Sequence, residues 1–260
     1  MTQSANLDRD EFGPATTKPR QGGIGGTVAL IILAVSAIVV LFGGRIFLYQ
    51  PFNIPSGSLV PSLLVGDYVF VSKLSYGYSH FSLPAPLDQL APPSGRLFAA
   101  QPKRGDMVVF KLPRDGQTDY IKRVIGLPGD KIQMIHGRLS INGEIVERKP
   151  LPPYVATSHF GSPAEVQHYE ETLPGGVSHE IIQLDGDNGF LSNTQVFEVP
   201  PGNYFMMGDN RDNSTDSRVA SDQGGVGFVP FDNLVGRADI IFLSLDGADV
   251  RWSRIFQPVK

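Results

Sequence analysis

The stretch "KIQMIHGRLSINGEIVER", residues 131–148, decides the fold class. Apolar and polar residues alternate on both sides of Asn142-Gly143, and an Asn-Gly pair between alternating runs is the strongest short signal of a β-hairpin. No helical pattern of any length follows residue 50, apart from a short one that could follow Pro61. The same two-residue period recurs along the chain at 106–112, 119–127, 179–185, 195–209 and 234–246. The sequence therefore predicts mostly β structure.

Composition supports this interpretation and excludes several classes of function. The 260 residues include 29 glycines and 21 prolines, which lie between apolar runs as turns lie between short strands. A net charge of −4 with no basic stretch gives no sign of nucleic-acid binding. The absence of cysteine excludes disulfides, thiolate metal sites and a cysteine nucleophile.

Two stretches carry few strand signals. Residues 77–102 are rich in proline, serine and glycine, and residues 149–178 are rich in proline, histidine and glutamate. Both are predicted to be surface loops or covers over a site.

The N-terminal part predicts a membrane anchor. Residues 1–26 are polar and glycine-rich, as in a disordered tail, and Val28–Phe42 is apolar apart from Ser36. With its flanks this run approaches the roughly 20 residues of a membrane span, so an anchor is predicted at 27–48. A cleaved secretory signal is the alternative, but its cleavage-type sequence, Ala34–Ala37, lies in the middle of the apolar run.

Charge gives a weak indication of orientation. Lys18 and Arg20 precede the apolar run and Arg45 follows it. The excess of positive charge on the N-terminal side favours a cytoplasmic N-terminus, with the rest of the chain outside the cytoplasm.

A second stretch, "NIPSGSLVPSLLVGDYVF" at 53–70, contains a candidate nucleophile, Ser58. Gly57 permits backbone angles closed to other residues, so a sharp, exposed turn is expected there. A serine hydroxyl needs an adjacent base to become a nucleophile. Any of five scattered histidines could serve, none of them at metal-ligand spacing: His80, His136, His159, His168 and His179.

The other candidate base is Lys122, in "DYIKRVIGLPGD". Alternation places Lys122 on the face of Tyr120 and the neighbouring Arg123 on the opposite face, so one of these two cations faces the less polar side. Burial can lower a lysine pKa by several units, and so large a cost points to catalysis. Taken singly, a Ser-Gly-Ser turn and a lysine in a strand are usually structural features without catalytic meaning.

Taken together, four stretches resemble the ordered sequence boxes of bacterial type I signal peptidases, behind an N-terminal anchor. These stretches are "PFNIPSGSLVPSLLVGDYVFVSKLSYG", "KRGDMVVFKLP", "DYIKRVIGLPGDKI" and "GDNRDNSTDSR…GFVPFDNLVGRA". The resemblance covers roughly residues 45–150 and 195–245. It implies a membrane-anchored serine endopeptidase that cleaves signal peptides from exported preproteins, without a metal or cofactor.

The resemblance also implies residue roles. Ser58 would be the nucleophile and Lys122 its general base, and Ser56 would complete an oxyanion hole with the backbone N–H of Ser58. Ser214 would hydrogen-bond Lys122 and orient it. Supporting ion pairs would come from Arg123, Asp209, Arg211, Asp216 and Arg218. Shallow substrate pockets for small side chains would be lined by Phe52, Ile54, Leu63, Tyr120 and Ile121.

The implied fold is a two-lobed antiparallel β structure on a single transmembrane helix. The catalytic lobe would combine 50–130 with 204–260, and 131–203 would form an inserted second lobe. The enzyme would lie in the bacterial inner membrane with its catalytic part outside, in contact with lipid, for which Trp252 and Phe256 are candidates. Two rivals remain at this stage, namely a Ser-Lys peptidase with another substrate and an inactive relative that only binds exported proteins.

Overall fold

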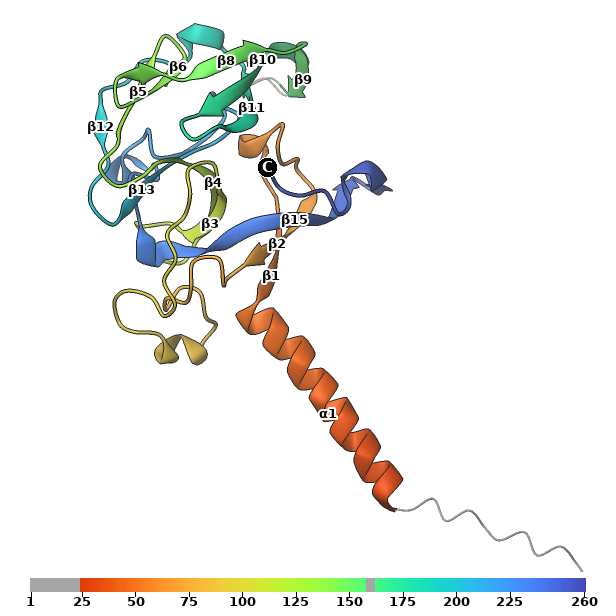
Figure 1. The fold of residues 1–260 in the computed structure, drawn as a ribbon. Coiled ribbons are helices and arrows are strands. Elements are labelled where there is room, and N and C mark those ends of the chain that lie inside the picture. Colours follow the sequence, from red (N-terminus) through yellow and green to blue (C-terminus); the bar gives the residue numbers. More distant parts are fainter. Residues whose placement is uncertain (1–23, 158–161) are drawn as a thin grey trace, which may run out of the picture. The chain divides into compact units, whose positions relative to one another are not determined.

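The computed structural model describes residues 24–157 and 162–260, drawn in Figure 1. The predicted disordered tail lies almost wholly outside the described residues, and so does His159. The chain divides into two compact units, Met1–Leu41 and Phe42–Lys260.

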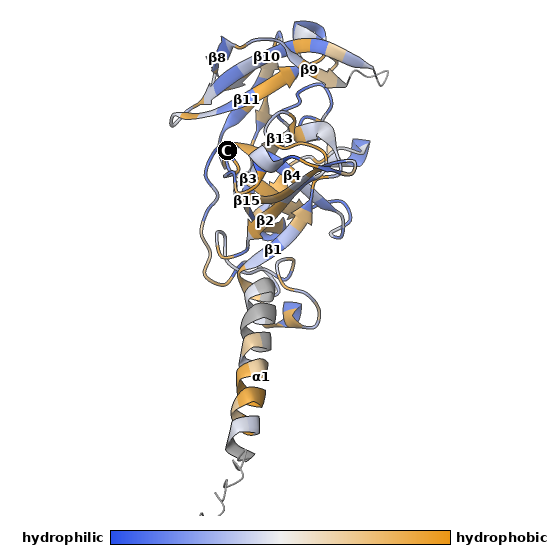
Figure 2. Cartoon of the chain, turned by 90° about the vertical axis from the view of Figure 1, so that its right-hand side faces the viewer, coloured by the Kyte–Doolittle hydropathy of each residue, from blue (hydrophilic) through white to orange (hydrophobic). Residues whose placement is uncertain are grey.

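A single long helix precedes the β structure of the described residues. Helix α1 spans Ile24–Phe47, and its middle part carries hydrophobic residues (Figure 2). The sequence therefore predicted a helix correctly at this place. Among the described residues, however, no helix has both the length and the apolar character that crossing a membrane requires. The anchor predicted at 27–48 coincides with a helix, and its crossing of a membrane stays a prediction.

The largest sheet brings together segments from both ends of the second unit. Its strands follow the order β1-β2-β15-β3-β4-β13-β14, with β16 beside β15, and the neighbouring pairs are antiparallel. The bounds are β1 Tyr49–Asn53, β2 Asp67–Ser72, β3 Met107–Lys111, β4 Asp119–Gly126, β13 Asn203–Met207, β14 Val229–Pro230, β15 Leu234–Asp246 and β16 Asp249–Val250. Strand β15, with the bounds that the sequence predicted, lies between β2 and β3 and so joins remote segments.

Two smaller antiparallel sheets come from the middle of the chain. One has the order β12-β5-β6-β7, and in the other β10 pairs with β8, β9 and β11. Their bounds are β5 Lys131–Ile135, β6 Arg138–Ile141, β7 Glu144–Ile145, β8 Glu147–Pro150, β9 Tyr154–Thr157, β10 Pro163–Leu173, β11 Val177–Gln183 and β12 Phe197–Glu198. The division into a catalytic and an inserted lobe stays a prediction.

The predicted hairpin at Asn142-Gly143 is confirmed. Both residues have positive φ, 56° and 86°, and Ile141 pairs with Glu144 across them. His136-Gly137 forms a second turn of the same kind, with φ of 45° and 70°, between β5 and β6. The stretch 131–148 therefore makes two successive two-residue turns, where the sequence indicated one.

One loop prediction is wrong. Residues 149–178 contain β9 and the whole of β10, an 11-residue strand. Apolar alternation could not indicate β10, because most of its residues are polar and one of its buried side chains is the charged Glu171. The stretch 77–102 contains no strand longer than an isolated bridge between Tyr78 and Leu97.

Short 3-10 helices connect the strands: Gly57–Leu59, Leu87–Leu90, Gly186–Asn188, Ser221–Gln223, Phe231–Asn233 and Trp252–Arg254. No longer helix follows Pro61 among the described residues. The first of these turns contains Ser58, and its neighbours Ile54, Leu59 and Leu63 are buried in the core between β1, β2, β3 and β15. Burying a leucine side chain contributes about 1.5–3 kcal/mol, so this core holds the turn firmly in place.

Candidate active site

The turn that carries Ser58 is held from two sides. Leu59 anchors it in the core, and Asn210 binds it from the loop after β13. The backbone N–H of Asn210 donates to the carbonyl of Ser58 at 3.1 Å, and its side-chain amide donates to the carbonyl of Gly57 at 3.2 Å. These contacts fix the backbone of the turn and leave the Ser58 hydroxyl free to face its partner.

The glycine of this turn does not have the role that the sequence predicted. Gly57 is not among the glycines with positive φ, and an added Cβ would meet only Val60 Cγ2 at 3.7 Å. Gly208 is the glycine that this site requires. A Cβ there would come within 2.3 Å of Ser214 Oγ and 2.5 Å of the Ser58 carbonyl oxygen. The turn of Ser58 and the loop after β13 approach each other so closely that no side chain fits at position 208.

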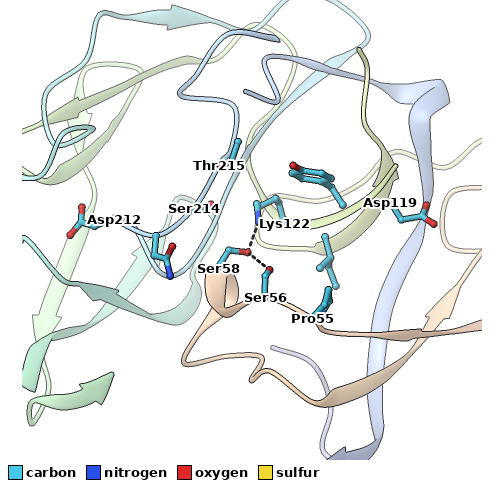
Figure 3. A pocket seen from close by; sticks show the side chains of 11 residues that line it. Pro55, Ser56, Ser58, Asp119, Lys122, Asp212, Ser214 and Thr215 are labelled. Atoms are coloured by element: carbon cyan, nitrogen blue, oxygen red, sulfur yellow. Dashed lines mark hydrogen bonds between the residues drawn. The ribbon is translucent and has the colours of Figure 1, made fainter. Parts of the chain in front are cut away.

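Lys122 lies directly beside Ser58. Its Nζ is 2.5 Å from Ser58 Oγ, and the two side chains are only 4% and 7% exposed (Figure 3). Burial lowers the pKa of Lys122 from 10.5 to about 8, against the opposing negative charges of Asp216 and Asp209. Both Lys122 and Arg123 are buried, because β4 is covered on both faces. The sequence predicted that one of the two side chains faces the less polar side, whereas both of them are buried.

Ser56 completes a row of three polar groups. Its Oγ is 3.4 Å from Ser58 Oγ, and Figure 3 shows the side chains of Ser56, Ser58 and Lys122 pointing toward one another. Ser56 is exposed, so its hydroxyl is accessible from the cavity. A hydroxyl at this place can donate to an oxyanion that forms beside Ser58.

Ser214 lies on the wall of the same cavity. Its buried Oγ has no hydrogen bond to Lys122, so the bond that the sequence predicted is not formed in this structure. Burial acts to raise the pKa of the nearby Asp216, and the charge and hydrogen bonds of Arg218 lower it. An orienting role for Ser214 stays a prediction.

The predicted charged residues form three buried ion pairs behind Lys122. Arg123 binds both carboxylate oxygens of Asp209, at 2.8 and 2.7 Å. Arg218 binds both oxygens of Asp216, at 2.9 and 2.8 Å. All four side chains are at most 1% exposed. Paired and doubly hydrogen-bonded charges can remain buried, whereas removing one partner costs about 3–5 kcal/mol.

The third pair has a partner that sequence reasoning missed. Arg211 binds both carboxylate oxygens of Glu171 from β10, and both side chains are 1% exposed. Two backbone hydrogen bonds also join β11 to this loop. The Ile182 N–H donates to the Asp209 carbonyl, and the Arg211 N–H donates to the Ile182 carbonyl, both at 3.0 Å. A glutamate in a polar, loop-like stretch gave no signal of its own. Only the fold brings Glu171 to the loop that holds Asn210 and Ser214.

A cavity of about 520 Å³ opens onto Ser58 and Lys122. A second one of about 170 Å³ adjoins it and is lined by Phe52, Ile54, Tyr120 and Ile121, whose role as a substrate pocket stays a prediction. Leu63 does not line either cavity, because it is wholly buried in the core beside Ile54. The open cavity beside a serine and an amine with a lowered pKa suits attack on a carbonyl carbon.

The histidines do not take part in this arrangement. None of the four in the described residues lines the cavity with Ser58. His179 is the most deeply buried, and its Nε2 is 3.7 Å from Glu171 and 3.9 Å from Asp209. Burial lowers its pKa to about 4, and the charge of Arg123 acts in the same direction. Lys122 is therefore the base candidate that the geometry supports.

Comparison with known proteins gives one consistent family. The family model described as "Signal peptidase, peptidase S26" matches residues 27–243. The signal peptidase I of Rickettsia typhi is 44% identical over 205 residues, which cover 77% of this chain and 74% of that protein. The signal peptidase I of Rickettsia prowazekii is 39% identical over 243 residues, 92% of this chain and 85% of its own. A crystal structure of a signal peptidase I from Enterococcus faecalis V583 matches 53% of this chain and 97% of its own, with 27% identity and a TM-score of 0.30.

Proposed function

We propose, for a chain that belongs to the signal peptidase S26 family, that Ser58 and Lys122 form the catalytic dyad. Family membership makes this chain a signal peptidase, a serine protease that cleaves signal peptides from preproteins. The assignment of the chemistry to individual residues rests on one observation above all. The Lys122 Nζ lies 2.5 Å from the Ser58 Oγ, in a buried position that opens onto a cavity.

The proposed reaction begins with proton transfer from Ser58 to neutral Lys122. With a pKa of about 8, roughly a tenth of Lys122 is neutral at pH 7, against less than about one part in a thousand at 10.5. The Ser58 oxygen then attacks the carbonyl carbon before the cleavage site. The Ser58 N–H and the Ser56 hydroxyl donate to the resulting oxyanion. As the C–N bond breaks, the Lys122 ammonium returns the proton to the leaving amine, and the signal peptide remains as an ester on Ser58.

Hydrolysis of the ester regenerates the enzyme by the same groups. Neutral Lys122 takes a proton from a water molecule, which attacks the ester carbonyl, and the Ser58 oxygen leaves with the proton from Lys122. Metal ions and cofactors have no part in the proposed steps.

The buried ion pairs support this reaction by limiting how far nearby negative charge raises the pKa of Lys122. Asp209 and Asp216 both raise the pKa of Lys122, and unpaired aspartates at this distance would hold the lysine protonated. Each aspartate is bound by an arginine through two hydrogen bonds, and Arg218 directly lowers the pKa of Lys122. The pairs thus position the active-site loop without an excess of negative charge.

We further propose that the substrate binds as an extended strand in the cavities beside β1 and β4. In the described residues β1 pairs only with β2, and β13 pairs with β4 only from Arg123 onward. Both strands thus leave an edge open where Phe52, Ile54 and Ile121 line the small cavity. An added strand gains main-chain hydrogen bonds, and a cavity of about 170 Å³ fits a small side chain.

The relation to the membrane is part of the proposal. Signal peptidase I relatives are membrane-associated enzymes, and we propose that the N-terminal segment attaches this chain with its catalytic part outside the cytoplasm. Support comes from the uncharged run Val28–Phe42 and from Trp252 and Phe256, which are 77% and 73% exposed and therefore free to contact lipid. Alkaline carbonate extraction of cell membranes tests this, since an attached protein stays in the pellet and a peripheral one is released.

The test of the dyad uses the full chain in detergent and a preprotein whose signal ends in Ala-X-Ala. The wild-type protein should release the mature protein at the expected bond, whereas Ser58→Ala and Lys122→Met should lower the rate at least about a thousandfold. Circular dichroism of each variant shows whether it is folded. Cleavage by folded Lys122→Met would assign the base to another group, and a wild-type protein silent on several preproteins would contradict the substrate class.

A further inference from the structure

A third cavity, of about 160 Å³, continues the row of cavities that starts at Ser58. Asp119 lines all three, and Phe52 lines both the second and the third. The lining residues run from Ser58 and Pro55 back along the chain into β1, through Phe52 to Gln50. The third cavity is thus the end of a groove that follows β1 away from the nucleophile.

The third cavity contains a buried lysine without a bonding partner. Lys73, directly after β2, is 3% exposed, and no described residue gives its amine a hydrogen bond or an ion pair. Asp119, the nearby carboxylate, already pairs with Lys111 at 2.9 Å. Burial lowers the pKa of Lys73 from 10.5 to about 8, and Asp119 offsets this only in part. The Lys73 amine thus opens onto the cavity without a protein partner and is available to an oxygen of whatever occupies the cavity.

The spacing of side chains along an extended strand indicates which substrate residue would reach Lys73. Side chains two residues apart lie on the same face of a strand, about 6.6 Å from each other. If the last residue before the cut lies beside Ser58 and the third from the cut in the pocket of Phe52, the fifth reaches the cavity of Gln50 and Lys73. The inference therefore rests on the strand-like binding proposed above.

The shape and lining of the cavity restrict the chemistry of its occupant. Its volume is close to the roughly 150 Å³ that accommodates a benzene ring, so it fits one side chain and no lipid headgroup with its glycerol. Phe52, Phe81, Leu83 and Val235 provide apolar walls for a methylene stem. The Lys73 amine would meet the end of that stem, and its unpaired charge favours a carboxylate over a neutral or positive group.

We propose that Lys73 forms a further substrate subsite, which binds an acidic side chain at the fifth residue before the cleavage site. The carboxylate of the signal peptide completes the hydrogen bonding of the Lys73 ammonium, and the stem packs on Phe52 and Val235. The subsite selects among signal peptides that all carry the small residues required near the cut.

The experiment compares peptides that differ only at this fifth residue. Peptides with Ala at the first and third residues before the cut, and Glu, Gln, Leu or Lys at the fifth, are cleaved by the full chain in detergent. Wild-type protein should prefer Glu over Lys by about tenfold in kcat/KM, the usual effect of one charge-assisted hydrogen bond. In Lys73→Met the ratio of the two peptides should approach one.

Lys149→Met is the matched control, because it removes the same charge from β8, where the side chain is 73% exposed and does not line the groove. It should keep the tenfold ratio. A wild-type protein without preference would overturn the proposal, even if Lys73→Met failed to fold, and so would a ratio that persists in Lys73→Met. If no peptide is cleaved at all, the proposed function itself fails.

Two further readouts identify the interacting group. The preference for Glu should weaken as pH rises through about 8, because Lys73 then loses its proton; the other charged groups that face it are Asp119 from β4 and Lys111 from β3. The assay is also repeated with vesicles of neutral and of anionic lipid. If Lys73→Met changes only the response to anionic lipid, the amine binds a lipid phosphate and the peptide subsite is refuted.

Discussion

The two ends of the proposed substrate groove each contain a buried lysine, and the two lysines differ in what surrounds them. Burial lowers the pKa of Lys122 and of Lys73 alike to about 8. Lys122 touches Ser58 and lies in front of three buried ion pairs, whereas Lys73 touches no polar partner and only Asp119 influences it among the described residues. The same desolvation thus suits Lys122, which has an adjacent hydroxyl, to the proposed role of general base, and Lys73, which has none, to the proposed role of binding site.

The largest expected change in stability comes from breaking one of the buried ion pairs near Lys122, which Lys73 lacks. Glu171→Ala leaves Arg211 buried without its carboxylate, so the free energy of unfolding should fall by about 3–5 kcal/mol, measured by urea denaturation. Glu170→Ala, whose side chain is 41% exposed and 3.8 Å from Lys149, is the control and should change it by less than about 0.5 kcal/mol. Equal effects of the two substitutions would contradict the importance of burial.

The next effect concerns the close approach of the loops that bring Ser58 and Lys122 together. Gly208→Ala places a methyl group 2.5 Å from the Ser58 carbonyl oxygen, and the resulting shift should cost about 1–3 kcal/mol of unfolding free energy. Gly57→Ala is the matched control, because its nearest contact is an ordinary 3.7 Å. Thermal unfolding followed by circular dichroism compares the two, and a Gly57→Ala variant less stable than Gly208→Ala would refute this steric account.

The third effect is the pH dependence of activity, which should depend on Lys122 and not on Lys73. With peptides that carry no acidic residue upstream, kcat/KM should rise about tenfold between pH 7 and 9, with a midpoint near 8, because only neutral Lys122 accepts the serine proton. Lys73→Met should keep this midpoint. If the midpoint moved or disappeared in Lys73→Met, the activity would report Lys73 rather than Lys122.

The smallest effect concerns the stability cost of Lys73. Because its pKa is lower in the folded state, the unfolded chain binds more protons between pH 8 and 10.5, and the cost is largest below pH 8. Lys73→Met, similar in volume and uncharged, should therefore raise the free energy of unfolding at pH 7 by about 1 kcal/mol, after allowance for solvent screening. The gain should shrink toward pH 10.5, and urea titrations at both pH values measure it. A variant less stable than the wild type at pH 7 would show that the amine has a partner in the folded protein.

Much of the fold could be predicted because its signals are local. The hairpin at Asn142-Gly143 and the long strand 234–246 follow from turn chemistry and alternation, which act between close neighbours. Strand β10 could not be predicted this way, because its polar sequence is stabilised by pairing with β8, β9 and β11 and by the buried contact of Glu171 with Arg211. Leu63 was assigned to a pocket and lies in the core, since the sequence does not say toward which side of a turn a leucine points.

The sequence by itself determined the types of residue available for catalysis and their family. Ser58 and Lys122 stand in motifs long enough to identify, and the matching family model covers both. The tertiary structure alone decided which groups meet, because Ser58, Lys122, Asn210 and Glu171 come from remote segments that only the sheets bring together. It also decided that Lys73 is buried without a bonding partner. Burial lowers the pKa of both lysines from the same ordinary value to about 8. Burial depends on everything packed around a side chain, and no local pattern of residues records it.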